Sequence, residues 1–161
     1  MAKLILTLGT LLGLTAVMTG AAEHAVRGMI EQDVLGPAID GQARRANDQL
    51  SDPVSHPQVA KRLAQYGTGV RYHMTHALAL VGLGLLTAFS TRGRVLCIAA
   101  AICFLLGVVL FSGSLYLISA FGMNQITMIV PFGGMFMIVG WGLFLLAVIR
   151  FEPLVDREDV D

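Results

Sequence analysis

The amino-acid sequence predicts an all-α, polytopic membrane protein: a bundle of four transmembrane helices with an amphipathic, partly helical first loop. Hydrophobic residues make up 55% of the 161 residues, charged residues make up only 14%, and the mean hydropathy is +0.72. Soluble domains carry about a quarter charged residues, so this balance indicates a membrane protein. Four apolar runs are also long enough to span a bilayer, which takes about 20 helical residues. We expect one membrane domain over residues 1–161.

Charge and chemistry exclude several function classes. The formal net charge is zero and no basic stripe could neutralise phosphates, so we expect no nucleic-acid partner. Cys97 and Cys103 lie in one apolar run and would point about 120° apart on a helix. We therefore interpret them as small apolar side chains. The chain carries no recognisable nucleophile–base pair or paired carboxylates, so we expect no enzyme and no cofactor.

The predicted spans are residues 4–24, 70–90, 95–119 and 130–150. The first span follows Lys3 and resembles a signal peptide, with a small-residue cleavage site near Thr19 to Ala22. Its apolar run of about 19 residues favours a spanning helix, and cleavage stays the alternative. Pro131 suits the first turn of the last helix, because its missing N–H would be unpaired there anyway.

Residues 25–69 form a polar loop, and residues 151–161 form a charged tail. Two apolar patterns in the loop have helical spacing and predict short amphipathic helices on a membrane face or at the end of the bundle. These patterns are Ile39/Ala43/Ala46/Leu50 and Val59/Leu63/Tyr66/Val70. Between them, Ser55 is the expected helix start.

Glycines recur on one face of the first and last predicted helices. Gly9, Gly13 and Gly20 share a face of the first helix, and Gly133 and Gly140 share a face of the last one. Such small-residue faces allow close helix contacts in membranes. We expect helix packing there, within the chain or with another protein.

Four spans place both termini on the same side of the membrane. Lys3, Arg92, Arg94 and Arg150 flank the spans on that side, whereas the connection between the third and fourth spans has no lysine or arginine. The positive-inside rule therefore predicts a multi-pass protein of the cell (inner) membrane with cytoplasmic termini.

Polar groups recur where the predicted spans approach the opposite membrane end. They are Glu23, His24, Arg71, Tyr72, His73, His76, Ser112, Ser114 and Tyr116. Unpaired polar groups are costly at membrane depth, so we expect these residues to form one layer. In that layer His24, Arg71, His76, Ser112 and Tyr116 would converge, with Glu23 near enough to balance Arg71. Arg71 could instead extend to the lipid head groups.

Three interpretations of this layer are open. It could be a structural network that fixes the helix register. It could also be a site for a proton or for a quinone, lipid head group or small solute. A metal site built from Glu23, His24, His73 and His76 has suitable donors, but Arg71 nearby would oppose a cation. We therefore expect no metal.

Four stretches carry a family resemblance. They are Gly20-Ala-Ala-Glu-His-Ala25, Val70-Arg-Tyr-His-Met-Thr-His-Ala-Leu-Ala-Leu80, Leu110-Phe-Ser-Gly-Ser-Leu-Tyr116, and Pro131-Phe-Gly-Gly134 through Gly140-Trp141. The chain resembles the small four-helix membrane family of unknown function that includes the eukaryotic transmembrane protein 256. His73 and Thr75 replace a glutamine and a tyrosine of the family pattern, Glu23 replaces a small residue, and Gly67 replaces an acidic one. The resemblance implies four helices in a cytoplasmic, inner or organellar membrane and no assigned reaction.

Two functional classes follow from these features. The glycine faces favour a small structural or accessory subunit that packs with itself or with a larger membrane complex. The alternative is a binder or carrier of a small polar or amphipathic ligand at the polar layer. The expected partners are membrane lipids, together with a second copy or a larger membrane complex.

Overall fold

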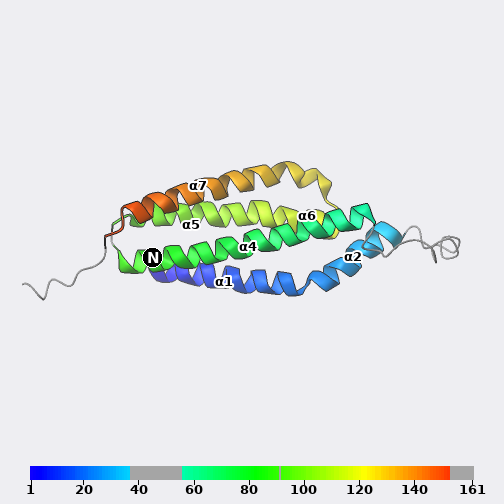
Figure 1. Cartoon of the computed structure of the whole chain (residues 1–161), viewed down its shortest axis with the longest axis horizontal. Coiled ribbons are helices and arrows are strands. Elements are labelled where there is room, and N and C mark those ends of the chain that lie inside the picture. The colour runs from blue at the N-terminus through cyan, green and yellow to red at the C-terminus, as the bar shows by residue number, and fades with distance from the viewer. Residues whose placement is uncertain (37–55, 91, 153–161) are drawn as a thin grey trace, which may run out of the picture.

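A computed structural model describes residues 1–36, 56–90 and 92–152. Its helices are α1 (Ala2–Ala21), α2 (Glu23–Leu35), α4 (Pro57–Phe89), α5 (Arg94–Val108), α6 (Ser114–Phe121) and α7 (Ile129–Ile149). A π-helical turn, η4 (Val109–Gly113), joins α5 to α6, and a 3₁₀ turn, η5 (Asn124–Met128), precedes α7. The described part of the chain is therefore helical throughout, apart from its turns (Figure 1).

Four continuous helical stretches are long and apolar enough to cross a membrane, which confirms the predicted fold class. They are Ala2–Ala21, Pro57–Phe89, Arg94–Phe121 and Asn124–Ile149. The stretches pack as two pairs, α1 against α4 and α5 against α7, and α4 joins the pairs through its contacts with α5 and α6. Figure 1 shows the N-terminus and the end of α7 at the same end of the bundle, as four spans require.

Helix α4 begins before the predicted second span. It has 33 residues and starts with Pro57 in its first turn, which makes it about 50 Å long, against about 30 Å for a hydrocarbon core. The prediction of a separate short helix over Val59 to Val70 is therefore wrong, because these residues continue directly into the span. No proline interrupts α4 after its first residue.

Helix α2 forms part of the first loop, which was expected to be partly helical. The first span ends at Ala21, before the predicted end at residue 24, and α2 follows it directly. Ile30 of α2 is fully buried, and Asp33 accepts a hydrogen bond of 2.6 Å from Arg62 of α4. The amphipathic helix over residues 39–50, the helix start at Ser55 and most of the charged tail lie outside the described residues.

The glycine faces lie at contacts between helices of this chain. A Cβ added at Gly9 would come within 2.9 Å of the Val81 backbone nitrogen on α4. A Cβ added at Gly140 would come within 2.6 Å of the Phe104 ring on α5. Gly133 faces the backbone of Phe111 even more closely. The α1–α4 and α5–α7 contacts therefore leave no room for larger side chains at these positions.

Candidate functional site

A partly buried network of side chains links α1, α4 and α6. His73 lies at its centre: Nδ1 is 3.1 Å from the Tyr116 hydroxyl, and Nε2 is 3.3 Å from the Thr15 hydroxyl. The Tyr116 hydroxyl is also 3.4 Å from the hydroxyl of Thr19, and the Tyr66 hydroxyl donates to the Thr19 carbonyl over 2.5 Å. We call these five residues the His73 network. Their mutual hydrogen bonds satisfy polar groups that would be costly in lipid.

Local sequence explains how the network forms. Thr15 and Thr19 are four residues apart and therefore share the face of α1 that meets α4. Gly69 lets the Tyr116 ring approach α4, because a Cβ at position 69 would lie 2.9 Å from Cε1 of that ring. The network therefore needs a small residue on α4 one turn before His73.

A second set of side chains surrounds His76 between α4 and α7. Nδ1 of His76 is 2.7 Å from the Tyr72 carbonyl oxygen, which can only accept, so Nδ1 carries the proton. Nε2 of His76 then accepts a 3.3 Å hydrogen bond from Nε1–H of Trp141. The His76 ring also meets Phe104 edge-on at 5.2 Å between centroids. Both ring nitrogens of His76 are thus used within the protein.

These side chains border a groove on the surface of the bundle. The groove has a volume of about 490 Å³, and its lining includes Arg71, Tyr72, His76, Phe111, Met137 and Trp141. We call it the α4–α7 groove. Arg71 is exposed there and donates a 3.2 Å hydrogen bond to the Thr68 hydroxyl. The groove offers aromatic and aliphatic walls with a cation and a phenol at one side, which suits an amphipathic molecule.

The sequence predicted that the polar side chains converge in a single layer, and this predicted arrangement is wrong. Tyr116 pairs with His73, whereas His76 pairs with Trp141, so the polar residues fall into two separate groups. Glu23 and His24 are exposed at the start of α2, because α1 ends at Ala21. Among the described residues they make no side-chain hydrogen bond to either group. The role of the nine candidate residues in ligand binding stays a prediction.

Two serines of the predicted layer lie inside the bundle. Ser112, in the π-helical turn, is fully buried, and its hydroxyl has no hydrogen-bond partner in the described part of the chain. Ser114 is 6% exposed. Within the described ranges, no group of three or more His, Cys, Asp or Glu side chains could hold a metal ion.

Sequence reasoning missed Trp141, Thr15, Thr19 and Tyr66 as members of these groups. Trp141 carries the one indole N–H of the chain and sits in an otherwise apolar helix, which was a usable signal. The threonines carry no such signal, because a threonine in a membrane helix can satisfy itself by bonding to its own backbone. Thr15 and Thr19 do so, to Leu12 and Ala16.

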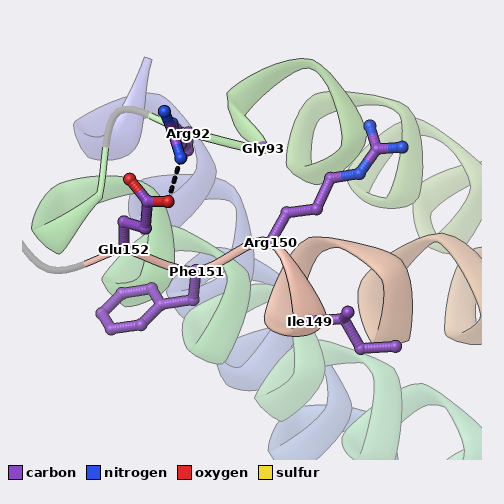
Figure 2. Close-up of a pocket in the computed structure, with 6 residues that line it drawn as sticks. All are labelled: Arg92, Gly93, Ile149, Arg150, Phe151 and Glu152. Carbon is purple, nitrogen blue, oxygen red and sulfur yellow. Dashed lines mark hydrogen bonds and ion pairs between the residues drawn. The ribbon is translucent and has the colours of Figure 1, made fainter.

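A second cavity lies at the end of the bundle that carries the termini. It has a volume of about 490 Å³ and is lined by residues around Arg92 and Arg150 (Figure 2). Arg92 forms an ion pair with Glu152, and both side chains are more than half exposed. The Arg150 side chain extends away from that pair (Figure 2). An exposed ion pair of this kind contributes little to stability. Glu152 also neutralises the Arg92 charge that an anionic ligand would need.

Fold and polar groups together define an integral membrane protein whose spanning helices bury polar side chains inside the bundle. Residues 45–134 match the family model described as "Protein of unknown function (DUF423)". The chain belongs to this family, as the resemblance to a membrane family of unknown function led us to expect. No solved structure matches the chain.

Curated relatives are named as membrane proteins. The chain is 37% identical to the UPF0382 membrane protein YwdK of Bacillus subtilis over 92 residues, 56% of this chain and 73% of the relative. It is 35% identical to the UPF0382 inner membrane protein YgdD of Escherichia coli over 85 residues, 53% of this chain and 63% of the relative. A UPF0382 membrane protein of Staphylococcus haemolyticus is 29% identical over 150 residues, 92% of this chain and 98% of the relative. These names state no activity.

Proposed function

We propose that the α4–α7 groove binds an amphipathic membrane molecule with an anionic or carbonyl-bearing head. The observation that carries the proposal is the joint presence of Arg71 and an aromatic wall in one groove of about 490 Å³. Ligand pockets of this size are mostly apolar, with a few polar groups that orient the ligand. A cation beside a lipid-facing groove in a spanning helix is a functional suspect, because it is costly without a partner.

The lining suggests how such a molecule would lie. Arg71 and the Tyr72 hydroxyl would donate hydrogen bonds to the head, because both side chains are exposed at the groove. Met137 and Ile138 would contact the apolar part. Both nitrogens of His76 already have partners, so His76 would act by holding Trp141 in place.

Ligand binding replaces assembly as the better supported class. The accessory-subunit hypothesis rested on the glycine faces, and these faces are occupied by helices of the same chain. For example, Gly20 faces Val70, with 3.4 Å between a Cβ at position 20 and the valine methyl. The glycine faces therefore no longer support packing with a second copy or with a larger complex.

Removal of the Arg71 charge tests this function. We expect native mass spectrometry of the gently extracted protein to detect a stoichiometric small molecule, and Arg71→Gln to reduce its occupancy by about tenfold. That factor corresponds to about 1.4 kcal/mol, near the lower end for a hydrogen bond to a charged group. Arg94→Gln, which removes a cation at the other end of the bundle, should keep the wild-type occupancy. A stoichiometric protein in place of a small molecule would contradict the proposal and support assembly.

We further propose cytoplasmic termini. The start of α1, the start of α5 and the end of α7 share one end of the bundle (Figure 1), and Lys3, Arg92, Arg94 and Arg150 lie in or next to these helix ends. Single cysteines at Ser51 and Asp159, in a chain with Cys97 and Cys103 replaced by alanine, test the orientation. In spheroplasts, an impermeant thiol reagent should label Ser51→Cys at once and Asp159→Cys only after permeabilisation. Labelling of both positions from one side would contradict the four-span topology.

A further inference from the structure

We propose that a phosphate-type anion binds at the first turns of α4, in a polar cavity distinct from the α4–α7 groove. The cavity has a volume of about 270 Å³ and is lined by Gln58, Lys61, Arg62, Gln65, Gly122 and Asn124. The four α4 residues are spaced i, i+3, i+4 and i+7, so they form one polar face of the helix. The turn after α6 closes the other side of the cavity.

The lining is rich in donors and contains no carboxylate. Lys61 supplies a positive charge, Arg62 lines the wall with a charge that is paired with Asp33, and the side-chain amides of Gln58, Gln65 and Asn124 supply further N–H groups. Phosphate oxygens accept hydrogen bonds from this combination of lysine, arginine and amide groups. Within the described residues, no ion pair involves Lys61, so its charge is available to a ligand.

Arg62 is held rigidly beside this cavity. Its Nε–H donates to the Ser119 carbonyl over 2.7 Å, and its Nη1 pairs with Asp33 over 2.6 Å. The side chain is only 13% exposed, whereas the Asp33 side chain is 61% exposed. Nη2 is buried and has no hydrogen-bond partner in the described part of the structure. A buried donor without a partner is costly, and the negative charge of an anion bound in the neighbouring cavity would offset part of that cost.

Gly122 shapes the wall of the cavity. Its φ of 65° ends α6 in the left-handed conformation, which glycine adopts without strain. A Cβ at this position would lie 3.6 Å from Nη2 of Arg62. The turn thus runs close to the guanidinium group and brings Asn124 to the same cavity.

The position of the cavity leaves two sources for the anion. Phe121 and Met128 beside the turn are 63% and 79% exposed, which suits a membrane interface. The phosphate group could therefore belong to an anionic phospholipid or to a soluble phosphate compound. The volume suits a phosphate with a small organic group such as glycerol, since it is below the range of drug-sized pockets.

Thermal unfolding of the detergent-purified full-length protein with inorganic phosphate, at constant ionic strength, tests the soluble source. We expect a saturable rise in the midpoint, with the apparent affinity reduced about tenfold in Lys61→Gln. Lys3→Gln removes a cation at the opposite end and should leave the affinity unchanged. Asn124→Ala, at an exposed residue, provides a second variant should Lys61→Gln not fold.

Nanodiscs of phosphatidylglycerol or phosphatidylcholine test the lipid source. A lipid phosphate is supported if the protein retains phosphatidylglycerol, if Lys61→Gln or Asn124→Ala reduces this retention, and if Lys3→Gln preserves it. This result supports the proposal even if inorganic phosphate has no effect. The proposal is overturned if neither probe binds saturably, or if Lys3→Gln weakens binding as much as the cavity variants do. Arg71→Gln should alter neither the phosphate affinity nor the lipid retention, which distinguishes this proposal from ligand binding in the α4–α7 groove.

Discussion

Gly133→Ala is expected to lower the free energy of unfolding by about 3 kcal/mol, near the upper end for overpacked cores. Gly133 of α7 faces the backbone of Phe111 and Leu110 in the π-helical turn, and a Cβ there would overlap backbone atoms. A flexible side chain could move away, but the backbone of η4 is held between α5 and α6. The α5–α7 pair would therefore have to separate. Reversible unfolding in mixed micelles measures the loss.

Gly142→Ala is the matched control on the same helix. A Cβ at Gly142 meets nothing within 4 Å, so the substitution should gain about 0.5–1 kcal/mol from the better helix propensity of alanine. Equal effects of the two substitutions would mean that α7 does not pack against η4 as described.

His76→Ala is expected to destabilise the protein by about 2 kcal/mol, the middle of the range for an orphaned buried polar group. In the single layer expected from the sequence, this change would leave Tyr116 or Ser112 without a partner. In the structure it instead removes the acceptor of the Trp141 indole N–H, and it opens space beside Phe104. In hydrocarbon, no water can replace that acceptor.

Leu85→Ala is the control for His76→Ala on the same helix. Leu85 is 47% exposed, so its truncation removes contact with lipid more than contact with other helices. We expect a loss below about 1 kcal/mol, since lipid tails are as apolar as leucine. A loss as large as that of His76→Ala would contradict the lipid-facing placement of Leu85 and would remove the contrast on which this comparison depends.

The fold was predictable from the sequence because bilayer thickness imposes a strong length requirement. The apolar runs and the glycine spacing therefore indicated the number of helices and the faces that meet. Helix α2 was not predictable in the same way, since Glu23, Arg27 and Asp33 make it polar and its stability comes from α4. Its ion pair with Arg62 joins residues 29 positions apart.

The candidate site was only partly predictable. The sequence indicated which side chains are polar at membrane depth, but helical angles alone did not indicate their partners. His73 and His76 are three positions apart in the sequence, yet the first meets α1 and α6 and the second meets α7. The π-helical turn at Val109–Gly113 also changes the rotation of Tyr116 relative to α5, and no periodicity in the sequence signals it.

The central claim is that the polar side chains form two separate groups, a closed His73 network and a His76–Trp141 pair beside an open groove. Double-mutant cycles of unfolding free energy test it most directly. His76→Ala with Trp141→Phe should show a coupling energy of about 1 kcal/mol, and so should His73→Ala with Tyr116→Phe. His76→Ala with Tyr116→Phe should be additive within about 0.5 kcal/mol. Coupling of His76 to Tyr116 as strong as its coupling to Trp141 would contradict the division and restore a single layer.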